Sequence, residues 1–257
     1  MLRAITELTA SFGRRDALVL CYHGVPSRPM FLAQLFVLED CGYPPLTLDG
    51  FRRWLAGDPP GDSRGALLTF DGGTRDQLHH AVPVLDACGA QGVFFPHSCF
   101  LDPTTAGKVE AMRKDDVAAL ARAGHVVGSH THTHRSLTRL APAAVESEIV
   151  TSKRILEDVI GKPVDVFCYP YGDHDRTVRA IVGGAGFDLA FTVDLGSVRR
   201  GHDRLALPRL CILGRPSLSQ FRAVLSGRFG VPGSLLLYWK IRLRVAPGND
   251  LDAGEMV

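Results

Sequence analysis

The chain has 257 residues, and its 29 Lys and Arg side chains against 27 Asp and Glu give a formal net charge of only +2 at pH 7. A near-neutral balance without a block of like charge argues against nucleic acid as an obligate partner and favours a small substrate. The length suits one sizeable α/β domain, and no apolar run approaches the roughly 20 residues that cross a bilayer.

Short apolar runs alternate with longer segments of helical character along the chain. The predicted strands are residues 17–22, 66–70, 92–95, 125–129, 164–168, 189–193 and 207–213. The predicted helices lie near residues 31–40, 48–56, 74–87, 114–123, 142–160 and 175–184. This alternation is typical of βα units around a mostly parallel sheet, and seven strands are enough to curl into a barrel.

These elements define a predicted core of residues 17–215, with an N-terminal extension (1–16) and a C-terminal extension (216–257). The first 20 residues lack an uninterrupted apolar segment with a small-residue cleavage site, and the six cysteines form no C-x-x-C pair. Both features predict a cytoplasmic location. The apolar stretch 233–245, which carries Lys and Arg, predicts a packed terminal element or, alternatively, peripheral contact with a membrane.

Three polar clusters follow predicted strands at their C-terminal ends, where α/β barrels and open sheets place their sites. Asp71 follows the second strand in "TFDGG", His130, His132 and His134 follow the fourth, and Tyr171 follows the fifth in "CYPYG". In a helical or an extended conformation, His130 and His134 lie on the same side of the segment. Neutral imidazoles are common metal ligands, so this pair predicts a metal site.

In these motifs the sequence resembles the polysaccharide deacetylase family, also called the NodB-homology family or carbohydrate esterase family four. The family motifs T-F-D-D-G, H-[ST]-x-x-H and R-x-P-Y-G are similar to "TFDGG" (69–73), "HTHTH" (130–134) and "CYPYG" (168–172), in the same order. The pieces "CYHGV" and "LPRL" extend the likeness to about residues 17–213. The resemblance implies a distorted (β/α) barrel of about seven parallel strands that hydrolyses N-acetyl groups of amino sugars with a divalent metal, commonly zinc.

The resemblance also implies roles for individual residues. Carried over position by position, Asp71 is the general base, and His130 and His134 hold the metal. The backbone around Tyr171 helps to bind the oxyanion of the tetrahedral intermediate. An amide carbonyl is a poor electrophile and water is a poor nucleophile. A metal ion can polarise the carbonyl and lower the pKa of the water, so it promotes the attack on both sides.

The first motif departs from the family pattern at a metal ligand. Gly72 stands where the family has its metal-binding Asp, and two imidazoles alone are expected to hold zinc weakly. Asp76 is the replacement ligand in the predicted set of His130, His134 and Asp76. Asp71 itself and Asp173 remain alternatives.

The general acid is also changed. Cys168 takes the place of the arginine in the third motif, and the late L-x-H motif that supplies the family's acid is absent. The candidates for an acid are three histidines: His23, His132 and His202. We select His23, in "CYHGV", as the catalytic candidate. His97, just past the third predicted strand, could line the site.

The predicted function is therefore metal-dependent hydrolysis of the N-acetyl group of an amino sugar or glycoside, with an altered set of metal ligands. Two alternatives stay open, because a fold does not decide a function. One is an impaired homologue that only binds a sugar or a protein partner. The other is a non-hydrolytic biosynthetic enzyme that uses the same site.

Overall fold

A computed structural model describes residues 16–57, 64–101 and 110–227, and the account below concerns these residues. Its centre is an all-parallel sheet of seven strands in the order β4-β3-β2-β1-β7-β6-β5. All seven predicted strands are present. They are β1 (Leu18–Tyr22), β2 (Ala66–Gly72), β3 (Gly92–Pro96), β4 (Val126–Val127), β5 (Val166–Cys168), β6 (Leu189–Leu195) and β7 (Leu207–Ile212).

The two edge strands of the sheet approach each other. Just beyond β4, the Ser129 N–H donates to the Val166 carbonyl (2.9 Å), and the Cys168 N–H donates to the Ser129 carbonyl (2.8 Å). β4 is shorter than predicted because the chain leaves β3 after Gly128 to make these bonds to β5. The sheet is therefore a nearly closed, distorted barrel of seven parallel strands, as predicted.

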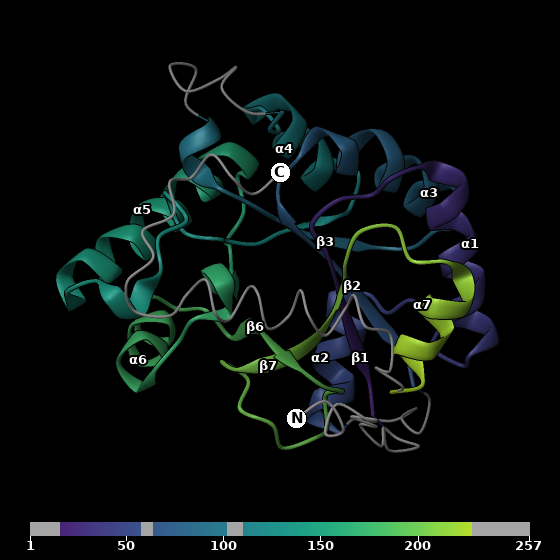
Figure 1. Cartoon of the computed structure of the whole chain (residues 1–257). Helices are drawn as coiled ribbons and strands as arrows, with labels where there is room; N and C mark the ends of the chain where they lie inside the picture. The colour runs from purple at the N-terminus through teal and green to yellow at the C-terminus, as the bar shows by residue number, and fades with distance from the viewer. Residues whose placement is uncertain (1–15, 58–63, 102–109, 228–257) are drawn as a thin grey trace, which may run out of the picture.

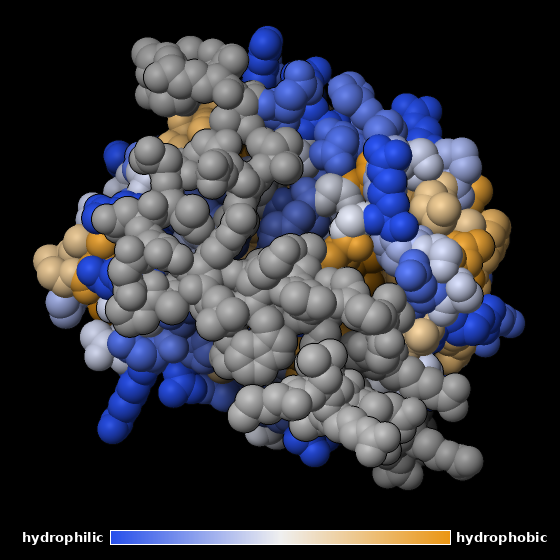
Figure 2. Space-filling model, viewed as in Figure 1, coloured by the Kyte–Doolittle hydropathy of each residue, from blue (hydrophilic) through white to orange (hydrophobic). Residues whose placement is uncertain are grey.

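Helices surround the barrel, with α1, α3 and α7 on one side, α4 at the top, and α5 and α6 on the other side of the view in Figure 1. The predicted helix 74–87 is divided into a π-helical turn η1 (Gln77–Ala81) and α3. The α-helices are α1 (Arg28–Asp40), α2 (Leu48–Ala56), α3 (Val82–Ala87), α4 (Lys114–Arg122), α5 (Pro142–Ile160), α6 (Arg176–Gly184) and α7 (Leu218–Leu225). Figure 2 shows hydrophilic residues over much of the visible described surface, and hydrophobic ones near α1 and α7.

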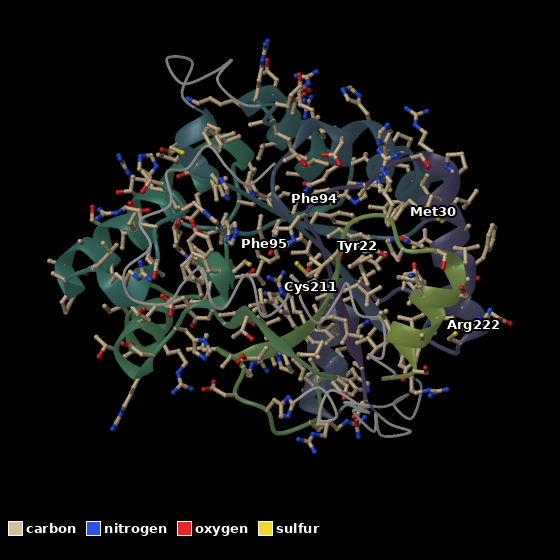
Figure 3. The ribbon with its side chains drawn as sticks, viewed as in Figure 1. Tyr22, Met30, Phe94, Phe95, Cys211 and Arg222 are labelled. Atoms are coloured by element: carbon tan, nitrogen blue, oxygen red, sulfur yellow. The ribbon has the colours of Figure 1, made fainter. Side chains whose placement is uncertain are left out.

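Side chains of each strand alternate between two cores. Phe94 belongs to the outer core beneath the helices, whereas its neighbour Phe95 belongs to the inner core, and the two lie on different sides of β3 (Figure 3). α2 adds Phe51 and Trp54 to the inner core. Because successive side chains of a strand point to opposite faces, this alternation defines which residues face the barrel interior. Burying a side chain of this size contributes roughly 1.5–3 kcal/mol.

The predicted extensions are described in part. α7, in the predicted C-terminal extension, buries Phe221 and Leu225 in the outer core beside α1. Residues 1–15 and 228–257, which include the stretch 233–245, lie outside the described residues. Among the helices that are described, none is long and apolar enough to cross a membrane.

Candidate active site

The inward-facing side chains become polar where the strands end. In β1 the inward series continues to Cys21 and His23, in β2 it ends at Asp71, and in β7 it includes Arg209. His97 follows Phe95 in the same alternation, directly beyond β3. Since parallel strands end at the same edge of a barrel, these side chains meet there.

Asp71 forms a buried ion pair with Arg209. The guanidinium donates to both carboxylate oxygens, with Nη1 at 2.8 Å from Oδ1 and Nη2 at 2.7 Å from Oδ2. The other Arg209 donors reach the Thr192 carbonyl, the Thr69 hydroxyl and the Cys168 sulfur, so all five N–H groups are used. Burial opposes ionisation of Asp71, but the Arg209 charge and hydrogen bonds hold its pKa well below its ordinary value.

Arg209 is the functional residue that sequence reasoning missed. Cys168, at the position where the third family motif has arginine, faces the same carboxylate and donates its thiol to Asp71 at 3.3 Å. The cation comes instead from β7, which β1 separates from the strand of Asp71 in the sheet. A charged residue at an inward position of the apolar strand "LPRLCI" was the available signal.

Three imidazoles gather beside this pair. His97, His130 and His134 each offer a ring nitrogen, and these nitrogens all lie within 4.8 Å of one another. The ring centroids are 4.4 Å apart for His97 and His134, 5.1 Å for His97 and His130, and 4.8 Å for His130 and His134. The predicted pair of His130 and His134 is thus brought together, with a third histidine from the segment just after β3.

Hydrogen bonds orient the ring of His130. Its Nδ1 lies 2.8 Å from the carbonyl oxygen of Cys168, which can only accept a hydrogen bond. Nδ1 therefore carries the proton, and the lone pair is on Nε2. The buried Nε2 of His97 has no hydrogen-bond partner among the described residues.

The backbone that carries His134 is held in an uncommon conformation. Thr131 and His134 have positive φ angles of 66° and 58°, and the His134 N–H donates to the Thr131 hydroxyl (3.1 Å). Glu148 of α5 accepts the His132 N–H at 3.0 Å. The Nδ1 of His132 lies 2.9 Å from the Ser98 hydroxyl, so this ring bonds to Ser98 and does not join the other histidines.

The histidine cluster is uncharged at neutral pH. Burial lowers the pKa of His130 to about 4 and holds the pKa values of His97 and His134 well below 6.5. Three neutral imidazoles are a donor set that zinc accepts at about 2.0–2.1 Å, and the partnerless His97 nitrogen is an unused donor. The residues present therefore fit a divalent metal ion.

Asp76 is placed elsewhere. Its carboxylate accepts the Val25 N–H at 2.6 Å and the Thr74 hydroxyl, and it belongs to none of the clusters of metal-binding side chains in the described structure. These bonds tie the η1 segment to the loop after β1, so the structure does not bring Asp76 to the histidines. Asp173, one alternative, accepts hydroxyl groups such as that of Ser136. Asp71, the other, has an oxygen within 4.8 Å of a His130 nitrogen, but both of its oxygens accept from Arg209.

His23 follows β1, the strand that lies between β2, which carries Asp71, and β7, which carries Arg209. Its Nε2 is 3.9 Å from Asp71 Oδ2, and its Nδ1 is 3.8 Å from the Cys21 sulfur, while half of the side chain is exposed. Burial opposes its charged form, but Cys21 and Asp71 raise the pKa of His23 to about 9. His202 instead contacts Arg199 in the loop after β6.

Tyr171 borders the histidine cluster from the third motif. Its ring centroid is 4.6 Å from that of His134. Its φ of 59° makes a tight turn of Pro170–Gly172, in which the Gly172 N–H donates to the Tyr169 carbonyl (2.9 Å). Tyr171 and the predicted pair His130 and His134 therefore converge on one place.

Comparisons with known proteins agree with this architecture. The sequence model of the polysaccharide deacetylase family matches residues 58–190, just over half of the chain. YxkH of Bacillus subtilis, named as a polysaccharide deacetylase, is 26% identical over 212 residues, which are 80% of this chain and 74% of YxkH. Two similar solved structures are IcaB from Ammonifex degensii (TM-score 0.70, 26% identity, 82% of this chain and 97% of that chain) and BC0361, a polysaccharide deacetylase from Bacillus cereus (TM-score 0.69, 25% identity, 82% and 69%).

Proposed function

Because this chain belongs to the polysaccharide deacetylase family, we propose that it hydrolyses the N-acetyl amide of an amino sugar or glycoside in a metal-dependent reaction. The observation that carries the proposal is the convergence of Asp71, His23 and the cluster of three histidines at one edge of the barrel. These are a proton acceptor, a proton donor and a set of metal ligands, the three components that amide hydrolysis requires.

His130 and His134 would hold the metal, commonly zinc in this family. When bound, such an ion polarises an amide carbonyl and lowers the pKa of water. The Cys168 carbonyl fixes the ring of His130 with its Nε2 lone pair available, and the left-handed turn fixes the backbone of His134. This prior orientation avoids a loss of side-chain freedom when a ligand binds.

Asp71 is assigned as the proton acceptor. Arg209 orients both oxygens and keeps the carboxylate ionised, which is the condition for accepting a proton. The low pKa of Asp71 also lets it return that proton readily. Arg209 contacts Asp71 and other protein groups but no reacting atom in this scheme, so it is a positioning residue.

His23 is assigned as the acid that protonates the leaving amine. The raised pKa of about 9 keeps its imidazole protonated at neutral pH, and its half-exposed side chain can reach a bound substrate. The backbone around Tyr171, beside His134, is assigned to the oxyanion that forms when the carbonyl is attacked.

The first test measures acetate release from N-acetylglucosamine oligomers. Protein stripped with a chelator and reloaded with zinc is expected to release acetate, whereas the stripped protein is not. His23→Gln should lower kcat by roughly 10²- to 10⁴-fold, the usual contribution of a general acid. His202→Ala, which removes a histidine outside the site, is the matched control and should keep full activity.

The pH profile tests the role of His23 separately. An acid works only while protonated, so kcat should hold at neutral pH and decline as the pH rises through about 9. In His23→Gln the residual activity should lack this alkaline limb. Loaded protein that releases no acetate from any acetylated amino sugar would contradict the proposed function.

A further inference from the structure

We infer that His97, His130 and His134 form a three-histidine site for one divalent metal ion, with His97 as the third protein ligand. The inference deepens the proposed function, since it names the ligand set of the ion on which that function rests. It differs from the sequence prediction, in which a carboxylate, Asp76, completed the pair of histidines.

The topology explains why the third ligand comes from β3. In the register of β2 and β3, Asp71 pairs with Phe95 and Gly72 with Pro96, so His97 is the next residue beyond the paired strands. Gly72 offers no side-chain donor, and both oxygens of Asp71 are engaged by Arg209. The segment after β3 therefore supplies an inward-facing donor, the His97 Nε2, that no hydrogen bond occupies among the described residues.

The geometry of the rings agrees with a shared ion. The His97 ring lies face to face with that of His134, with an interplanar angle of 30°, and the nitrogens of all three rings are within 4.8 Å of one another. Bonds of 2.0–2.1 Å to a tetrahedral ion require N···N separations of about 3.3 Å, so the three nitrogens must move closer together when an ion binds. His97 Nε2 is buried without a partner, although buried polar atoms are normally satisfied.

The chemistry of the donors predicts which ions are accepted. Imidazole suits Zn²⁺, Co²⁺ and Ni²⁺, whereas Mg²⁺ and Ca²⁺ prefer oxygen ligands. Three histidines leave the fourth position of a tetrahedral ion open, as in catalytic zinc sites. An all-imidazole site therefore differs in selectivity from one that contains a carboxylate.

The experiment titrates the stripped full-length protein with Co²⁺ and measures visible absorption, then measures zinc affinity by competition with a chromophoric chelator. Wild-type protein is expected to bind one ion, with no competition from excess Mg²⁺ or Ca²⁺. His97→Ala and the bulkier His97→Gln should each lower zinc affinity by at least about 100-fold, since even residues that only support a metal ligand contribute 10- to 100-fold. His202→Ala and Asp76→Asn should bind zinc like the wild type, and circular dichroism should show every variant folded.

The outcomes separate this inference from the proposed function. Zinc affinity that is unchanged in folded His97→Ala and His97→Gln, or that falls in Asp76→Asn by the same factor, would overturn the three-histidine site. Acetate release by the wild type would then still support the deacetylase function. A wild type that binds zinc through His97 but releases no acetate would support the site and refute the function, and a wild type that binds no ion would refute both.

Discussion

At the scale of single residues, the ion pair of Asp71 and Arg209 determines the charge and the position of the carboxylate in the site. Both side chains are buried, with 2% and 0% of their surface exposed, and every guanidinium donor is used. Taking two charges out of water is costly, so such a pair persists only where the geometry is good. Its consequence is a carboxylate that is fixed in place and ionised beside the histidine cluster.

This pair predicts a large effect of single substitutions on stability. Arg209→Met leaves the buried Asp71 charge without a partner and should lower the free energy of unfolding by about 3–5 kcal/mol, as should Asp71→Asn, which leaves Arg209 unpaired. The double variant should lose less than the sum of the two, because neither uncompensated charge then remains. Urea denaturation measures all three, and additive losses would contradict the coupling.

At the scale of elements, the turn after β2 and the end of β3 form one unit. A Cβ atom at Gly73, which has a φ of 65°, would lie 2.7 Å from the Pro96 Cβ and 2.8 Å from its Cα. A Cβ at Gly72, with a φ of 91°, would meet only the Thr74 methyl at 3.9 Å. Of these two residues, only Gly73 must therefore lack a side chain, because its backbone packs directly against Pro96, the residue before His97.

The two glycines predict different results for the same substitution. Gly72→Ala should lower stability by about 1–2 kcal/mol, the backbone strain of a left-handed non-glycine residue. Gly73→Ala should lower it further and should also weaken zinc binding, because the Pro96 backbone and the adjacent His97 must move. Urea denaturation and chelator competition measure the two effects, and equal zinc affinities in the two variants would contradict a link between this turn and His97.

At the scale of the whole molecule, the candidate metal site crosses the seam where the barrel closes. His97 follows β3, His130 and His134 follow β4, and the His130 ring bonds to the Cys168 carbonyl of β5. The Phe95 and Cys211 side chains in the middle of the ribbon in Figure 3 are inside the same enclosure of strands. An ion held here would join the segments after β3 and β4 directly, and β5 through the hydrogen bond of His130.

Metal binding is therefore expected to stabilise the entire fold. Zinc at 100 times its dissociation constant should add about 2.7 kcal/mol to the free energy of unfolding, if the unfolded chain does not bind it. For a chain of this size, that corresponds to a rise in Tm of roughly 5–11 °C. Differential scanning calorimetry of stripped and reloaded protein measures the rise. At the same zinc concentration, His97→Ala with about 100-fold weaker affinity should gain at most about 0.4 kcal/mol.

Local pattern was sufficient for the elements and for part of the site. Alternating and helical periodicities depend on neighbours in the chain, so the seven strands and six of the helices could be predicted, while α7, in the C-terminal extension, was not. His130 and His134 are four residues apart, and their proximity is likewise a local property. Asp71 was identified because its strand ends at a motif similar to that of a known family.

The remaining partners required the folded chain. Arg209 lies 138 residues from Asp71, and His97 lies 33 residues before His130, so no local pattern joins them. The sequence by itself determined a parallel αβ barrel, the edge where its polar residues gather and two of the histidines. Only the tertiary structure decided which cation holds Asp71, where Asp76 is placed and which third imidazole joins the pair, because strand register and barrel closure bring distant residues together.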